Sequence, residues 1–131
     1  MWPFTLNGRP GTASDATLSP KQLQGQLAEQ RARQYLEEQG LKLMQANFRC
    51  KGGEIDLILR DGAALVFVEV RQRNGSAHGG AAASITPAKV RRIVRAAQVY
   101  LARLPRLPRC RIDVVAIDGD QLEWLRDAIQ V

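Results

Sequence analysis

Two acids and one cation with strand-like spacing carry the chemistry that this sequence suggests most directly. Asp56 lies in a segment that alternates charged and apolar residues, and Glu69 and Arg71 follow in a second segment of the same kind. A hairpin of the two segments would stack these side chains on one face of a sheet. Such gathered carboxylates are typical of metal-dependent phosphodiesterases, with Mg²⁺ or Mn²⁺ as the expected ion.

The register of the hairpin decides how the two acids meet. Gly62 supplies the backbone conformation that a tight turn needs. A turn centred on Gly62 and Ala63 places Asp56 opposite Glu69, with Cβ atoms about 5 Å apart, whereas a turn one residue earlier makes the acids diagonal neighbours. Both registers allow one ion to be shared. In both, one face is apolar and consists of Ile55, Leu57, Leu59, Val66, Val68 and Val70.

A simpler interpretation of the same residues remains open. Glu54 and Arg71 can form an ion pair at the wet end of the hairpin while Asp56 is solvated. Like charges that face each other on a sheet are unfavourable unless a cation compensates them, so the clustering favours the metal site.

A helix is expected before the hairpin, over residues 20–39, between an N-cap at Ser19 and a stop at Gly40. Glu29 lies at the edge of its apolar stripe, where it either leans into a cleft beside the sheet or pairs in solvent with Arg33. The stripe is expected to consist of Leu23, Leu27, Ala28, Ala32, Tyr35 and Leu36.

A second helix is expected over residues 87–104, after the N-cap signal Thr86-Pro87. Its inward positions are Val90, Ile93, Val94, Ala97, Leu101 and Leu104. Besides the hairpin, strands are expected over residues 41–48 and 111–118, and a short strand or a tail over residues 122–125.

Charge is distributed unevenly along the 131 residues, whose net charge is +6. No acid occurs between Val70 and Ile112, a stretch that holds ten of the nineteen Lys and Arg residues. This predicts either a surface that binds the phosphates of a nucleic acid or a plain solvated face. The residues predicted to contact nucleic acid are Arg73, Lys89, Arg91, Arg92 and Arg95.

The length predicts one domain over residues 19–131, preceded by a flexible N-terminal arm over residues 1–18, which lack periodicity. Cys50 and Cys110 have no metal-ligand spacing and are expected to be reduced thiols. No stretch is apolar and long enough for a signal peptide or a membrane span. We therefore expect a cytoplasmic protein with no membrane partner.

Several motifs together resemble the YraN family of small bacterial proteins. They are Glu29, Gly53-Glu54-Ile55-Asp56-Leu57-Ile58, Phe67-Val68-Glu69-Val70-Arg71-Gln72-Arg73, Gly79-Gly80 and Arg111-Ile112-Asp113-Val114-Val115. That family is similar in fold and motif order to the restriction-endonuclease-like, or PD-(D/E)xK, superfamily, and especially to archaeal-type Holliday junction resolvases. The resemblance implies an α/β fold: a single restriction-endonuclease-like domain with an α-β-β-β-α-β core and a mixed sheet flanked by helices.

The resemblance also implies catalytic roles. Asp56 and Glu69 match the metal-binding acids, Glu29 matches an acid from the first helix that acts through water, and the carbonyl of Val70 completes the metal shell. Arg71 stands where lysine is usual, and a guanidinium cannot act as a base, although it binds phosphate oxygens or orients water.

The implied function is a Mg²⁺-dependent endonuclease of structured or branched DNA, with a homodimer as one expected assembly. The arginine leaves a second function open, namely a nucleic-acid-binding module that has the nuclease-like fold and does not cleave. A protein-interaction domain is the third.

Overall fold

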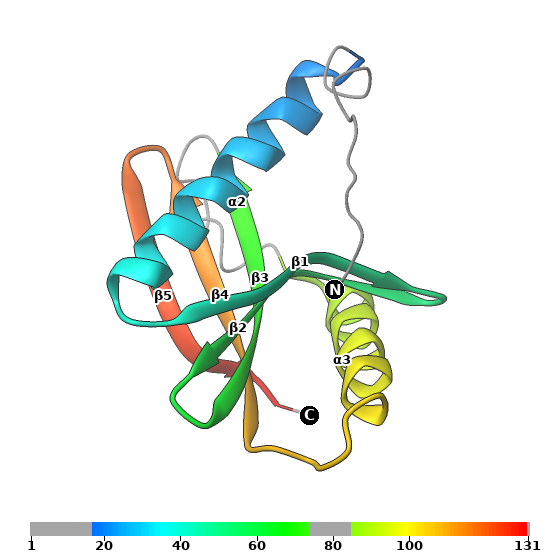
Figure 1. Cartoon of the computed structure of the whole chain (residues 1–131). Coiled ribbons are helices and arrows are strands. Elements are labelled where there is room, and N and C mark those ends of the chain that lie inside the picture. Colours follow the sequence, from blue (N-terminus) through cyan, green and yellow to red (C-terminus); the bar gives the residue numbers. More distant parts are fainter. Residues whose placement is uncertain (1–16, 74–84, 131) are drawn as a thin grey trace.

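The chain folds around one five-stranded sheet (Figure 1). The computed structural model describes residues 17–73 and 85–130. Its elements, in chain order, are α2 (Pro20–Glu38), β1 (Lys42–Cys50), β2 (Gly53–Asp61), β3 (Ala64–Arg73), α3 (Pro87–Ala102), β4 (Cys110–Asp118) and β5 (Gln121–Ile129). The order confirms the predicted α-β-β-β-α-β core and adds one strand. Most of the predicted N-terminal arm lies outside the described residues.

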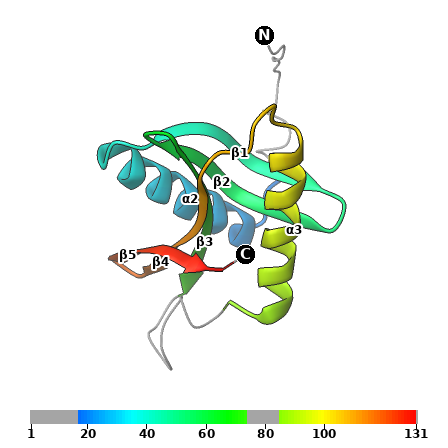
Figure 2. The same cartoon turned by 90° about the horizontal axis from the view of Figure 1, so that it is seen from below.

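The sheet is mixed, as predicted. Its strands lie in sequence order, and only β3 and β4 are parallel neighbours, so that α3 is the crossover between them. The two helices cover opposite faces (Figure 2). Leu36 of α2 packs against Leu57, Val66 and Val115 on one face, and Ile93 of α3 belongs to the cluster on the other. Neither helix is both long and apolar enough to cross a membrane.

The predicted helix starts are confirmed. Ser19 and Gln22 form a capping box in which each side chain accepts a hydrogen bond from the other residue's backbone N–H, at 3.1 and 2.9 Å. Thr86 caps α3 by accepting a bond from the N–H of Lys89 at 3.1 Å. Gly40 follows α2 with a φ of 99°, which a residue with a Cβ rarely adopts.

The hairpin of β2 and β3 has the first of the two predicted registers. Asp61 pairs with Ala64, so the turn is centred on Gly62, whose φ is 61°, and Ala63. The predicted apolar face is confirmed except at Ile55. Its side chain joins the cluster under α3, because the alternation of β2 breaks between Ile55 and Leu57.

The buried stripe of α2 is narrower than predicted. Ala28, Ala32 and Leu36 are buried, but the side chains of Leu23 and Leu27 are 47% and 54% exposed. The N-terminal turns of α2 extend beyond the sheet (Figure 1), so no strand among the described residues covers these leucines.

The last strand, β5, is longer than the predicted residues 122–125. It is held to β4 by the buried carboxylate of Asp113, which accepts hydrogen bonds from Arg111 Nε, Trp124 Nε1 and the N–H of Asp127 at 2.8 to 3.1 Å. A second bond from Arg111 reaches Asp61 Oδ2 at 3.0 Å. The acid of the Arg111-to-Val115 motif is therefore structural.

Gly53 is the point at which β2 and α3 come closest. A Cβ at this position would collide with the carbonyl oxygen of Arg92 and lie 3.0 Å from the backbone nitrogen of Ala96. Only glycine therefore allows α3 to lie this near the first residue of β2.

We expect Gly53→Ala to lower the free energy of unfolding by about 1–3 kcal/mol, because either β2 or α3 must shift. Urea unfolding measures the change. Gly25→Ala is the matched control: no atom lies within 4 Å of its new Cβ, and in mid-helix it should stabilise the protein by up to about 1 kcal/mol. Equal effects of the two substitutions would contradict the close packing at Gly53.

Candidate functional site

The candidate site begins where β2 and β3 stop pairing. Their ladder ends at the pair Leu57 and Val68, so Asp56 and Glu69 occupy the next facing positions without a strand bond between them. The backbone N–H of Val70 donates instead to Asp56 Oδ2 at 2.8 Å. A side chain thus replaces the missing strand partner, and the carboxylate is fixed between the two strands.

A cavity of about 390 Å³ opens at this place. It is bounded by α2, by the separating ends of β2 and β3, and by the first turn of α3. Six of the residues predicted to form the site line it together: Glu29, Asp56, Glu69, Val70, Arg71 and Lys89. Lys21, Gln24, Gly25 and Ala28 complete the wall on the α2 side.

Glu69 is the most buried acid of the cavity, with 1% of its surface exposed. Burial, followed by the negative charge of Asp56, raises its pKa to about 8, although the charges of Lys89 and Arg71 act in the opposite direction. When ionised, its Oε1 atom finds no hydrogen-bond donor among the described residues. This carboxylate can therefore accept either a proton or a cation.

The side chain of Glu29 faces the sheet and is only partly exposed to solvent. Burial and the neighbouring charge of Asp56 raise its pKa to about 7, while hydrogen bonding from Asn47 lowers it. Asn47 belongs to β1 and has a φ of 54°. Arg33, the alternative partner, pairs instead with Glu37 at 3.3 Å. Glu29, Asp56 and Glu69 thus interact as one group of acids, with Asp56 in the middle.

Two cations flank this group. Arg71 NH1 and Lys89 Nζ each lie 3.6 Å from Glu69 Oε2. Lys89 Nζ also lies 3.4 Å from Glu54 Oε2, and Arg92 NH2 lies 3.8 Å from Glu54 Oε1. Glu54 thus contacts the first turns of α3, and the acids and cations form one connected set.

The donor set suits a hard divalent cation in part. Asp56 and Glu69 offer carboxylate oxygens, the preferred ligands of Mg²⁺, and the unpartnered Oε1 of Glu69 supplies one of them. Within residues 17–73 and 85–130, however, no three His, Cys, Asp or Glu side chains are close enough together to form a complete metal site. Two carboxylates, with a backbone carbonyl such as that of Val70 and water, would hold the ion.

The remaining predicted nucleic-acid contacts do not line the cavity. Arg91, Arg92 and Arg95 are exposed on α3, beside it, and Lys89 alone of the α3 residues reaches into it. Arg73 is the last residue of β3. The predicted Gly79-Gly80 loop lies outside the described residues.

Three contacts of this site were not predicted from the sequence: Glu54 with Lys89, Asn47 with Glu29, and Lys89 with Glu69. Glu54 holds Lys89, which had been predicted only as a nucleic-acid contact. Asn47 reaches Glu29 from a strand position with positive φ, for which the sequence offers no signal. The capping signal at Thr86 correctly predicted that Lys89 lies in the first turn of α3. Its contact with Glu69 was not predicted, because it depends on the separation of β2 and β3.

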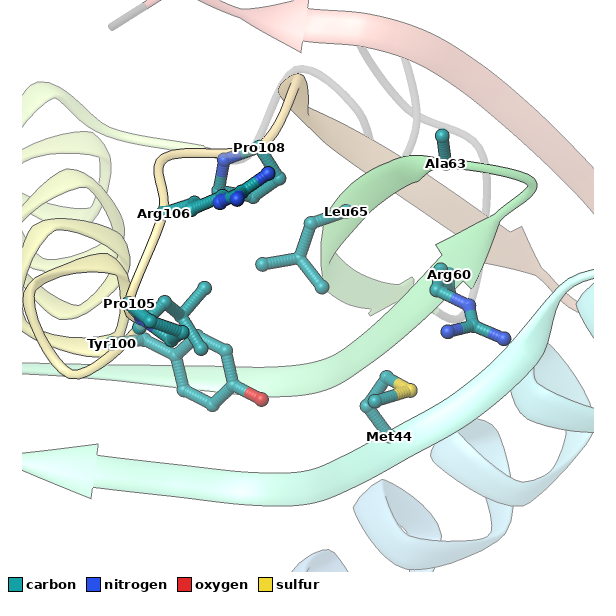
Figure 3. Close-up of a pocket in the computed structure, with 9 residues that line it drawn as sticks. Met44, Arg60, Ala63, Leu65, Tyr100, Pro105, Arg106 and Pro108 are labelled. Atoms are coloured by element: carbon teal, nitrogen blue, oxygen red, sulfur yellow. The ribbon is translucent and has the colours of Figure 1, made fainter.

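A second cavity, of about 290 Å³, contains none of the predicted site residues (Figure 3). It lies between the end of α3 and the β2–β3 turn, and Met44, Leu65 and Tyr100 form much of its apolar wall. Its wall is mainly apolar, whereas acids and bases line the cavity that contains Asp56 and Glu69.

Comparison with known proteins identifies relatives along nearly the whole chain. The protein-family model described as "Uncharacterised protein family UPF0102" matches residues 28–117. A UPF0102 protein of Herminiimonas arsenicoxydans is 52% identical over 126 residues, which cover 96% of both chains. A UPF0102 protein of Cupriavidus metallidurans is 62% identical over 109 residues, 82% of this chain and 81% of the relative. These matches confirm the resemblance to the YraN family.

The raised pKa values predict how stability depends on pH in the presence of EDTA. A carboxyl whose pKa is higher in the folded than in the unfolded protein stabilises the fold below its ordinary pKa, and this stabilisation is lost as the pH rises through the folded value. For Glu69 the window runs from 4.5 to about 8. We expect the free energy of unfolding to fall across it, by up to about 1.4 kcal/mol per pH unit.

Glu69→Gln should flatten this decline and make the metal-free protein more stable at pH 8, because an amide adds no charge beside Asp56. Urea unfolding at several pH values tests this. Glu38→Gln, on the exposed end of α2, is the control and should leave the profile unchanged. A Glu69→Gln protein that is less stable than the wild type at pH 8 would mean that the acid is structural.

Proposed function

The chain belongs to the uncharacterised protein family UPF0102, and we propose that it is a Mg²⁺-dependent endonuclease that hydrolyses phosphodiester bonds in structured or branched DNA. The observation that supports this most is the meeting of Glu29, Asp56 and Glu69 in one cavity, beside a helix whose exposed side is basic. Acids that repel one another are kept together where a bound cation is used.

In this proposal, Asp56 and Glu69 hold the ion, and Glu29 orients water from the helix side. The Asp56 carboxylate is pre-positioned by the N–H of Val70, so metal binding requires no rearrangement of its backbone. A bound Mg²⁺ or Mn²⁺ would lower the pKa of its water and neutralise charge on the phosphate. Arg71 holds a phosphate oxygen or orients water, because it cannot accept a proton.

A second candidate function is favoured by one specific observation. Arg71 and Lys89 already lie beside Glu69 Oε2, and a protonated Glu69 needs no metal. The same fold would then be a nucleic-acid-binding module without hydrolytic activity. Metal-dependent cleavage distinguishes the two functions.

We expect Mg²⁺ or Mn²⁺ to support nicking of a four-way junction more strongly than nicking of a linear duplex or a single strand. Asp56→Asn should reduce cleavage by at least about 10²-fold and weaken metal binding, because the ion loses a charged ligand. Cleavage on gels and metal titration by calorimetry measure these effects. Asp120→Asn, in the exposed β4–β5 turn, is the matched control and should behave like the wild type.

Salt-sensitive DNA binding without metal uptake or nicking would replace the nuclease with the binding module. No binding at all would support the protein-interaction domain. Two active sites are needed to cut two strands at once, so the proposal includes a homodimer, and the mass of the protein in solution by light scattering tests it.

The basic side of α3 is expected to bind DNA phosphates. Replacing both Arg91 and Arg95 by Gln should weaken binding of all DNA sequences and reduce the slope of log K against log salt by about 2, because two phosphate contacts are lost. Fluorescence anisotropy at several salt concentrations measures this.

Arg126→Gln is the control for this pair. Arg126 packs over Trp124, which belongs to the cluster on the α2 side of the sheet. An equal loss of slope in this control would mean that the charge of the whole protein, and not the α3 surface, determines binding.

A further inference from the structure

We infer that Lys89, alongside Arg71, supplies positive charge that binds the scissile phosphate, and that Glu54 positions Lys89 for this role. The inference rests on the proposed function and concerns the same cavity. It is carried by the placement of one ammonium group between two carboxylates from different strands, at the mouth of a cavity that also contains the candidate metal ligands.

The position of Lys89 is fixed by the fold rather than by its own flexible side chain. Its backbone N–H is bonded to the cap residue Thr86, so Lys89 stands in the first turn of α3. The contact of Gly53 with the backbone of Arg92 fixes the distance of that turn from β2. The ammonium of Lys89 therefore reaches the sheet where β2 and β3 separate.

The two carboxylate oxygens of Glu69 have different surroundings. Its Oε2 atom faces Lys89 and Arg71, each at 3.6 Å, whereas Oε1 has no donor among the described residues. A cation at Oε1 would leave the ammonium of Lys89 in place at Oε2. Lys89 would then remain available to bind a phosphate in the same cavity.

Lys89 and Arg71 approach Glu69 from different elements. The side chain of Lys89 is 21% exposed and lies between Glu69 and Glu54, at 3.6 and 3.4 Å. The side chain of Arg71 is more exposed, at 31%, and comes from the same strand as Glu69, two residues away. An ammonium is a compact point charge that can approach a single phosphate oxygen, and here it is already restrained by two acids.

Glu54 is the positioning residue in this arrangement. Its Oε2 atom contacts Lys89, and its Oε1 atom is 3.8 Å from Arg92, so one carboxylate holds two cations of α3. Glu54 does not line the cavity, so it can act on the reaction only through the cations that it holds. The effect of Glu54 on the reaction should therefore depend on the presence of Lys89.

The proposed step requires no proton transfer from Lys89. The oxygen of a water molecule forms a bond to phosphorus while the bond from phosphorus to the leaving sugar oxygen breaks. The attacking water releases a proton to solvent, and the leaving oxygen takes one up from solvent. Negative charge increases on the non-bridging phosphate oxygens in the transition state, and Lys89 stabilises it by donating a hydrogen bond.

The test compares cleavage and metal binding in the same full-length variants. Lys89→Met should reduce the rate of Mg²⁺-dependent cleavage by about 10²-fold or more, because a charged donor to the transition state is lost. Its affinity for Mn²⁺ should be unchanged or higher, because a positive charge has left the vicinity of Glu69. A residue that only supports the fold would weaken both.

Four further variants sharpen the test. Lys89→Arg should keep more activity than Lys89→Met because it keeps the charge. Glu54→Gln should reduce cleavage less than Lys89→Met does, and the double variant should be no slower than Lys89→Met alone. Lys42→Met, on exposed β1 opposite Arg60 in the strand register, is the matched control and should cleave at the wild-type rate.

The outcomes separate this inference from the function on which it rests. Wild-type activity in the Lys89→Met protein, or a loss of Mn²⁺ binding together with cleavage, overturns the role of Lys89 and leaves the nuclease in place. Additive losses in the double variant overturn the positioning role of Glu54. A wild-type protein that binds DNA but cleaves none of the substrates overturns the nuclease and, with it, the inference.

Discussion

The separation of β2 from β3 at Asp56 is the feature on which the rest of the site depends. A regular ladder would continue past the pair Leu57 and Val68, and the backbone N–H of Val70 would then bond to the backbone of β2. The carboxylate of Asp56 takes that bond instead, from the N–H of Val70. The two strands can then diverge without leaving that backbone donor unsatisfied, and the space between them becomes the cavity. The same divergence shifts Ile55 to the α3 face, so one local irregularity changes both the core and the site.

Two close contacts bring helices to the edges of this opening. On one face, the small buried residue Ala28 lets α2 approach the strands, and the next residue, Glu29, meets Asp56. On the other face, Gly53 lets α3 approach β2, and Lys89 meets Glu69. The acids are therefore assembled from a helix and two strands, while the two cations beside Glu69 come from β3 and α3. Such a site exists only in the folded protein, since its members are distant in sequence.

The sequence predicted local features well and their meeting points less well. The helix caps at Ser19 and Thr86 depend on short-range chemistry, and both were predicted correctly. The hairpin register was narrowed to two alternatives, because Gly62 allows more than one turn. Leu23 and Leu27 were wrongly predicted to be buried: helical periodicity shows which residues share a face, but not where the sheet ends. The contacts of Lys89 with Glu54 and Glu69 could not be predicted, since they require the distance between α3 and β2.

The charge balance of the cavity explains why the same geometry supports two candidate functions. Three acids and three bases line it, so its formal charge is zero when all are ionised; they are Lys21, Glu29, Asp56, Glu69, Arg71 and Lys89. With pKa values of about 7 and 8 for Glu29 and Glu69, protonation near neutral pH makes the cavity positive and able to attract a phosphate. A divalent cation that replaces such a proton makes the cavity more positive and adds an activated water. Either occupant would thus favour phosphate binding, whereas hydrolysis would require that the metal outcompete the proton at Glu69.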